Sequence, residues 1–209
     1  MTLEIGQVVD NKYRIVRLLG QGAMGAVFEG ENVRIKRRVA IKVLHGIAAE
    51  RRDLIDRFER EAQAAGRIGS EHIVEVLDLG ELPDQSRYLV MEFLEGESLG
   101  QRVETVGRML PAQALPILRE LLVGLGAAHQ AGIVHRDLKP DNVFLLKEKA
   151  GRRDFVKIVD FGISKFNPLN GEDAKMTQTG SVMGTPYYMS PEQAKGSKSI
   201  DQRSDLFSV

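Results

Sequence analysis

Three glycines, Gly20, Gly22 and Gly25, lie between two stretches that alternate polar and apolar residues, and this pattern strongly constrains the fold. The stretches Tyr13 to Leu19 and Ala26 to Glu31 have the period of two that is typical of β-strands. A G-x-G-x-x-G pattern that opens a helix would instead indicate a dinucleotide-binding fold. Because a strand pattern follows here, we predict a hairpin whose backbone N–H groups can approach phosphate oxygens. Taken alone, an ordinary glycine-rich turn is an equal alternative.

The remaining pattern predicts an α+β protein in two parts. Apolar residues recur at helical spacing between Leu54 and Ile68, and a long helical pattern covers Pro111 to Gly132, with Gly132 as its C-cap. Short segments rich in β-branched and aromatic residues predict further strands at Arg38 to Leu44, Ile73 to Leu79 and Arg87 to Phe93. The polar run Glu95 to Ser98 is interpreted as a break, which gives a first domain over 1–94 and a second over 95–209.

Composition excludes several classes of protein. Hydrophobic residues make up 43% of the chain, enough for a sizeable core, and Lys+Arg and Asp+Glu both number 29, which argues against a bulk nucleic-acid binder. Cysteine is absent, so neither disulfides nor thiolate chemistry is available. The N-terminus shows no signal peptide, and the apolar stretch Leu115 to Val134 carries Arg119 and Glu120, typical of a buried helix rather than a membrane span. We therefore expect a cytoplasmic protein, or one at the cytoplasmic face of a membrane if a longer parent protein carries a span.

Lys42 ends the string Val39-Ala40-Ile41-Lys42, in a strand that is otherwise apolar. Alternation places Lys42 on the same face as Ala40 and Leu44, where a charge must be paired or must face a cleft. Glu61, in the following helix, is the candidate partner. The alternative is that both side chains are simply solvated, as most lysines and glutamates are.

The string His135-Arg136-Asp137-Leu138-Lys139-Pro140-Asp141-Asn142, followed by Asp160-Phe161-Gly162, is the most informative stretch. With the glycine pattern and the Lys42 strand upstream, four motifs occur in the order typical of protein kinases. The chain from Tyr13 onward resembles the bacterial-like branch of the eukaryotic-type serine/threonine protein kinases. The resemblance implies a bilobal protein-kinase-like fold, with an antiparallel sheet and one helix in the N-lobe and a mostly helical C-lobe that is incomplete at its C-terminus.

The resemblance also implies a role for each matching residue. Asp137 would be the catalytic base, Lys139 would neutralise the transferred phosphoryl group, and Lys42 would hold the ATP phosphates and pair with Glu61. Asn142 and Asp160 would ligate Mg²⁺ (or Mn²⁺), a hard cation that takes oxygen ligands. Thr185 would help to select serine and threonine acceptors. The implied nucleotide contacts are Leu19, Gly20, Gln21, Gly22, Ala23, Met24, Gly25, Ala26, Val27, Ala40, Lys42, Met91, Glu92 and Leu94.

The segment from Asp160 to Glu192 is rich in hydroxyl groups and resembles an activation segment. Asn167 to Gly180 reads as a mobile loop, and Arg136 marks the subclass in which a phosphorylated loop residue pairs with that arginine. We expect autophosphorylation at Thr177 or Thr179, with Ser181 less favoured; ordinary loop solvation is the alternative. Self-association for phosphorylation in trans and binding of protein substrates are the expected interactions, with no nucleic acid.

The chain ends at Val209, within what resembles the central C-lobe helix. In the family Asp205 braces the catalytic loop, while Glu192 pairs with an arginine from later helices. We expect the 209-residue chain alone to be unstable or poorly active, since apolar surface on the long helix would lose its cover. Two other functions stay open: a non-catalytic nucleotide-binding module, and a small-molecule phosphotransferase, which Lys139 and the docking-like segment Gly184 to Glu192 argue against.

Overall fold

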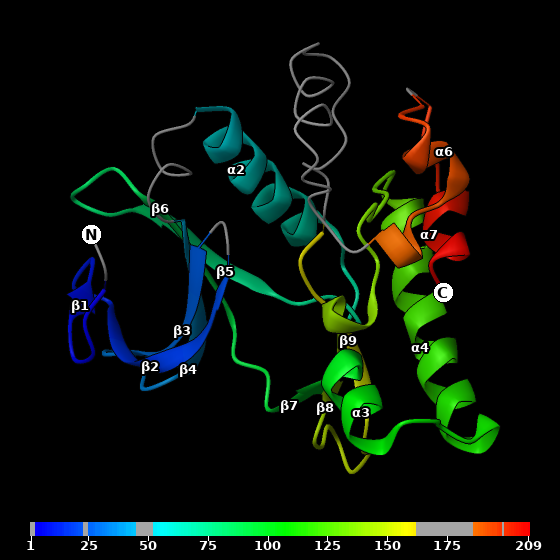
Figure 1. Ribbon diagram of the computed structural model, residues 1–209. Helices are drawn as coiled ribbons and strands as arrows, with labels where there is room; N and C mark the ends of the chain where they lie inside the picture. Colours follow the sequence, from blue (N-terminus) through cyan, green and yellow to red (C-terminus); the bar gives the residue numbers. More distant parts are fainter. Residues whose placement is uncertain (1–2, 23–24, 45–51, 162–185, 198) are drawn as a thin grey trace. The chain divides into compact units, whose positions relative to one another are not determined.

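A six-stranded antiparallel sheet forms from the first part of the chain in the computed structural model, which describes residues 3–22, 25–44, 52–161, 186–197 and 199–209 (Figure 1). The strand order is β1-β2-β3-β4-β6-β5. The strands are β1 (Val8–Val9), β2 (Tyr13–Gly22), β3 (Gly25–Asn32), β4 (Arg38–Leu44), β5 (Val76–Glu81) and β6 (Arg87–Glu92). The predicted antiparallel sheet is confirmed, and β4 has the bounds expected from the sequence.

The predicted glycine-rich hairpin is also confirmed. Strands β2 and β3 pair antiparallel, and their register brings Gly22 opposite Gly25. No helix opens after the glycines, so the dinucleotide-binding alternative is excluded. Ala23 and Met24, at the turn itself, lie outside the described residues.

The sheet buries one face more deeply than the other. Phe28, Ile41 and Val90, which are each at most 5% exposed, belong to the apolar cluster on the more buried face. On the alternating face Val27, Ala40 and Lys42 are only partly buried, whereas Leu89 and Met91 are 6% and 8% exposed. Lys42 therefore lies on the less buried face, together with Ala40, as the period of two predicts.

Helix α2 (Arg52–Arg67) confirms the predicted helical segment, with Phe58, Ala62 and Ala65 buried at helical spacing. The following strand begins later than expected, because β5 starts at Val76 and not at Ile73. Ile73 instead makes an isolated parallel bridge to Ile158, and its carbonyl oxygen accepts a hydrogen bond from Lys157 Nζ at 3.1 Å. The backbone of Ile73 is therefore paired with the segment around Lys157 and Ile158 and not with a strand of the six-stranded sheet.

The second part of the chain combines a three-stranded sheet, in the order β7-β8-β9, with the long helix α4. Its elements are β7 (Gly96–Ser98), α3 (Leu99–Val106), α4 (Pro111–Gln130), η1 (Pro140–Asn142), β8 (Val143–Leu146), β9 (Phe155–Ile158), η3 (Pro186–Tyr188), α6 (Pro191–Ala194) and α7 (Arg203–Phe207). Helix α4 is followed by Gly132 at φ 75°, the left-handed conformation expected of a C-cap glycine.

The run Glu95 to Ser98, expected to be a polar break at a domain boundary, contains regular structure, and the two compact units divide in the sequence after Glu95. Residues Gly96–Ser98 form strand β7, which pairs with β8, and Ser98 then caps helix α3 in a reciprocal capping box with Gln101. The backbone of this polar run is therefore paired, and it connects directly to a helix that we had not predicted.

The chain divides into two compact units, one of residues 1–66 and 74–95 and one of residues 67–73 and 96–209. Each has its own apolar core, and the second is built from α4, β8 and β9 around Leu125, Val143 and Ile158. None of the described helices is both long and apolar enough to cross a membrane.

Candidate active site

A buried carboxylate holds the loop that follows helix α4. Asp205, on α7 and 1% exposed, accepts hydrogen bonds from the backbone N–H groups of His135 and Arg136, both at 2.8 Å. The same carboxylate contacts His129 Nε2 at 2.7 Å, which ties α7 to the C-terminal turn of α4, where Figure 1 shows the two helices beside each other. The expectation that Asp205 braces this loop is confirmed.

His135 is fully buried, and its ring makes hydrogen bonds to the backbone on two sides. Its Nε2 lies 3.1 Å from the carbonyl oxygen of Val159, which can only accept, so Nε2 must carry the proton. Its Nδ1 then accepts the backbone N–H of Asp137 at 3.2 Å. Only the neutral ring can make both bonds, and burial lowers the pKa of His135, which favours that form.

Three of the predicted polar residues meet at the ends of β8 and β9. Asn142 Nδ2 donates to the backbone carbonyl of Asp137 at 2.8 Å and to its carboxylate Oδ2 at 3.3 Å. The backbone N–H of Val159 donates to the carbonyl oxygen of Asn142 at 3.0 Å, and Asp160 is the next residue. The antiparallel register, with Val143 opposite Ile158, thus brings Asn142 and Asp160 to the same end of the hairpin.

Two residues here have strained backbones. Arg136 has φ 65° and Asp160 has φ 54°, in the left-handed region that residues other than glycine rarely enter. Such conformations cost about 1–3 kcal/mol each and are concentrated at functional sites. The bonds from Asp205 and His135 fix the loop on either side of Arg136, so the surrounding structure holds the strained conformation.

Further contacts complete the loop. Lys139 Nζ lies 3.5 Å from Asp141 Oδ2 in a partly exposed ion pair. Gln193, buried on α6, donates through Nε2 to the carbonyl oxygen of Arg136 at 2.7 Å. We did not predict roles for Gln193 or His129, and no local pattern marks them, because their partners are far away in the sequence. Glu192 accepts a hydrogen bond from Ser204 Oγ at 2.5 Å.

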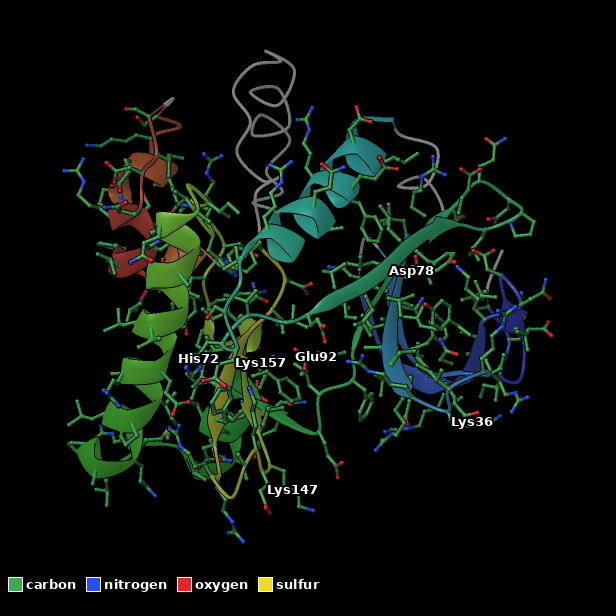
Figure 2. The ribbon with its side chains drawn as sticks, turned by 180° about the vertical axis from the view of Figure 1, so that it is seen from behind. Lys36, His72, Asp78, Glu92, Lys147 and Lys157 are labelled. Carbon is green, nitrogen blue, oxygen red and sulfur yellow. The ribbon has the colours of Figure 1, made fainter. Side chains whose placement is uncertain are left out.

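In the first unit, the predicted nucleotide-binding residues lie on neighbouring strands of the sheet. Val27 pairs with Lys42 between β3 and β4, and Ala40 pairs with Met91 between β4 and β6. Paired residues share a face of the sheet, so these four side chains lie on the less buried face. The carboxylate of Glu92, whose position is marked in Figure 2, accepts the backbone N–H of Glu75 at 2.8 Å.

The three hairpin positions are occupied by glycine for different reasons. A Cβ at Gly25 would collide with the carbonyl oxygen of Val43, so Gly25 is required by the packing of β3 on β4. A Cβ at Gly20 or Gly22 would meet no described atom within 4 Å, and neither has a positive φ. Packing therefore does not explain these two glycines, and the space beside them fits the close approach of a phosphate group.

The donor set also fits a divalent cation. Asn142 and Asp160 supply amide and carboxylate oxygens, the ligands that Mg²⁺ prefers, and bound phosphates usually complete its coordination. Among the described residues there is no group of three or more His, Cys, Asp or Glu side chains able to hold a metal by themselves. Two protein ligands plus a phosphate-bearing nucleotide are consistent with that finding.

Several predicted positions cannot be compared with the structure. Thr177, Thr179, Ser181, Thr185 and Gly162 lie outside the described residues, as does the side chain of Glu61. Leu19 and Gln21 are exposed on β2, and the side chain of Ala26 faces the core, which leaves its backbone for a ligand contact. Leu94 follows β6 and is partly buried.

Comparison with known proteins gives a consistent result. A profile of the family described as "Protein kinase domain" matches residues 13–209. The chain is 46% identical over 201 residues to serine/threonine-protein kinase pkn2 of Myxococcus xanthus, covering 96% of this chain and 24% of that protein. It is 37% identical over 205 residues to serine/threonine-protein kinase PrkC of Bacillus subtilis, covering 98% of this chain and 30% of that protein.

The fold is similar to that of solved kinase domains. A crystal structure of a double mutant of the Mycobacterium tuberculosis PknI kinase domain matches with a TM-score of 0.76 and 29% identity, covering 100% of this chain and 73% of that chain. Against the full-length curated relatives, the chain spans between about a quarter and two fifths of their length. Together with the loop geometry, these matches show that the chain belongs to the protein kinase domain family, among relatives named as serine/threonine-protein kinases.

Proposed function

We propose that the chain carries the catalytic machinery of an ATP-dependent serine/threonine protein kinase. The observation that carries this proposal is the arrangement of Asp137, Asn142 and Asp160, held at one end of the β8–β9 hairpin by the braced loop. Residues 1–94 would act as the smaller lobe and residues 95–209 as part of the larger one. The similarity to serine/threonine-protein kinases and the free space beside Gly20 and Gly22 support the same conclusion.

In the proposed reaction, bound Mg·ATP supplies the γ-phosphoryl group and the metal charge that offsets its developing negative charge. Asp137 accepts the proton of a substrate hydroxyl as the new O–P bond forms and the bond to the leaving ADP breaks. Asn142 and Asp160 would hold the metal, and Lys42 and Lys139 would place positive charge beside the phosphates. Phosphoryl transfer depends mainly on positioning and charge, which a rigid loop provides.

Lysine at position 139 supports a serine or threonine acceptor, since that residue two positions after the base is typical of the serine/threonine branch. The substrate would be a polypeptide, because residues 184–192 resemble the family's docking segment for protein acceptors. Leu19, Val27, Ala40 and Met91 would contact the adenine side of the nucleotide, together with the backbones of Glu92 and Leu94.

Transfer of radiolabelled phosphate from Mg·ATP to a generic basic protein tests the proposal. Asp137→Asn and Lys42→Met should each reduce the rate at least about 100-fold, the usual contribution of acid–base or electrostatic groups. Matched controls are Asp201→Asn, at an exposed carboxylate just before α7, and Lys36→Met, on the exposed turn between β3 and β4 that Figure 2 marks. An active Asp137→Asn protein, with rates equal to these controls, would refute the assignment.

Autophosphorylation of Thr177 or Thr179 is the second part of the proposal. The two hydroxyls precede the docking-like segment, and Arg136 is the cation that would receive a phosphate. Incubation with Mg·ATP followed by peptide mass spectrometry should show phosphate on this segment in the wild type and none in Asp137→Asn. Absence of phosphate from wild-type protein that is active on other substrates would refute this part alone.

A further inference from the structure

One buried amide side chain joins α6 to the loop that presents Asp137. Gln193, on α6 and 4% exposed, donates through Nε2 to the carbonyl oxygen of Arg136 at 2.7 Å. Its Oε1 accepts the backbone N–H of Ser190 at 3.0 Å. A backbone N–H can only donate and a carbonyl oxygen can only accept, so these two partners fix the orientation of the amide. Both ends of the Gln193 side chain are therefore used inside the protein.

The bond from Gln193 is made to the peptide group that joins Arg136 to Asp137. The N–H of the same peptide group, which belongs to Asp137, donates to His135 Nδ1 at 3.2 Å. Because a peptide group is planar, holding its oxygen and its hydrogen fixes the plane from which the chain enters Asp137. Arg136 has φ 65°, a conformation that persists only where the surrounding structure holds it. Gln193 thus acts on the peptide group directly before the proposed base.

A second set of contacts connects Gln193 to the same loop through α7. The hydroxyl of Ser190, which caps α6, donates to Ser204 Oγ at 3.1 Å, and both serines are 0% exposed. Ser204 is followed by Asp205, whose carboxylate accepts the backbone N–H of Arg136 at 2.8 Å. Arg136 is therefore held at its N–H from α7 and at its C=O from α6, two helices that Figure 1 shows next to each other. A displacement of α6 is transmitted to Arg136 through buried groups.

Gln193 directly follows residues 184–192, the segment that resembles a docking site for protein acceptors. We propose that Gln193 is a positioning residue, which couples this segment to Asp137 through the peptide group of Arg136. It touches neither nucleotide nor acceptor in this proposal and acts only on the orientation of the base. The effect on phosphoryl transfer rests on the function proposed above, whereas the coupling between α6 and the loop does not.

The alternative is that Gln193 only caps α6. Ser190 and Gln193 form a reciprocal capping box, which is a sufficient local reason for both residues. Ser98 and Gln101 form the same box at the start of α3. Gln101 is exposed, and its Nε2 makes no hydrogen bond to residues 135–142, all of which the structure describes. Gln101 is therefore a matched control with the same cap and without the bond to the loop.

The substitution Gln193→Glu separates the two roles. A carboxylate keeps an oxygen for the N–H of Ser190 and completes an equally common capping box, but it has no donor for the carbonyl oxygen of Arg136. With a generic basic protein as acceptor, kcat should fall at least about tenfold, because misplaced reacting groups are costly, while the KM for ATP stays unchanged. Gln101→Glu should keep the wild-type kcat. Equal kcat values for the two variants would overturn the proposal.

The pH profile gives a readout that a capping role would not change. When the carboxyl group of Gln193→Glu is protonated, its O–H can donate to the carbonyl oxygen of Arg136 and restore the missing bond. Burial raises the pKa of a carboxyl group, so the ratio of variant to wild-type kcat should rise as pH is lowered from about 8 to about 6. Gln193→Met, which is of similar length but has no donor, should show a constant ratio. A constant ratio for both variants would refute the role of this hydrogen bond.

Amide hydrogen exchange, measured without nucleotide, tests the coupling independently of activity. The amide of Asp137 should exchange faster in Gln193→Glu than in the wild type and at the wild-type rate in Gln101→Glu. A thermal melt of each protein checks folding, and Gln193→Met replaces Gln193→Glu here if the latter does not fold. Unchanged exchange at Asp137 would overturn the coupling and leave the kinase function standing. Faster exchange in a chain whose wild type transfers no phosphate would instead sink the proposed function and keep the coupling.

Discussion

Replacement of Asp205 should destabilise the second unit more than any other conservative change of a single carboxylate described above. Its two oxygens accept the backbone N–H groups of His135 and Arg136, and it also contacts His129, all in a site where Asp205 is 1% exposed. In Asp205→Asn, one oxygen becomes an NH₂ group that faces a backbone donor. One buried N–H then loses its acceptor, which costs about 1–3 kcal/mol. The remaining hydrogen bonds also become weaker, because the neutral amide lacks the negative charge of the carboxylate.

We therefore expect Asp205→Asn to lower the free energy of unfolding by roughly 2–4 kcal/mol. Asp205→Ala, which leaves both backbone donors unpaired, should lower it by roughly 3–6 kcal/mol. Domains are stable by only about 5–15 kcal/mol, so the second variant approaches complete unfolding. Urea denaturation followed by circular dichroism measures the change.

Amide hydrogen exchange gives a local readout of the same change. The amides of His135 and Arg136 should exchange faster in Asp205→Asn than in the wild type, by more than the global loss of stability requires. The matched control is Asp201→Asn, four residues earlier and exposed, whose carboxylate binds only the exposed Arg203 and its N–H, so little change is expected. If Asp205→Asn and Asp201→Asn unfold at the same urea concentration, the bracing argument is wrong.

Three further predictions follow from other buried groups. Leu125→Ala, at a residue that is 1% exposed, should cost about 2–5 kcal/mol in denaturant unfolding, whereas Leu122→Ala, at a residue that is 44% exposed, should cost clearly less. Because burial lowers the pKa of His135, the unfolded chain binds the extra proton first, so stability should fall as pH drops below about 6.5 and until the lowered pKa is passed; His135→Gln should flatten that part of the profile. Burial tends to raise the pKa of Glu29, yet hydrogen bonds from Arg38 and Arg17 outweigh it and leave the pKa below its usual value. Glu29→Gln should therefore cost about 1–2 kcal/mol at pH 7, and the difference should disappear as pH falls through that lowered pKa, which denaturation at a series of decreasing pH values would show.

The strands and long helices could be predicted because their side chains repeat with the right period. In β4, Val39, Ile41 and Val43 are nearly fully buried and alternate with less buried residues, so pattern and fold coincide. Helix α3 was not predicted, although Leu99, Val103 and Val106 recur at helical spacing, because the helix has only eight residues and none of them is buried. A second signal was available: Ser98 followed by Gln101 is the sequence signature of a capping box.

The candidate site was likewise predicted only in part from sequence patterns. Asp137, Asn142 and Asp160 were identified from strings of residues, and the hairpin register brings Asn142 and Asp160 together. The groups that hold them, Gln193 and His129, were missed because each acts through one contact with a residue 57 or 76 positions away. A single long-range hydrogen bond leaves no periodic trace, so sequence patterns point to the proposed reacting groups and not to the residues that hold them in place.

The supports explain why the polar loop can hold a strained backbone. Arg136 at φ 65° has a conformation that costs about 1–3 kcal/mol, and its neighbours are fixed through the N–H groups bound by Asp205. Its carbonyl oxygen is held in turn by Gln193 from α6. Each of these bonds contributes an energy similar to the strain, so together they exceed it. The loop that presents Asp137 is thus fixed before any ligand binds, and a reaction that depends on positioning gains from that order.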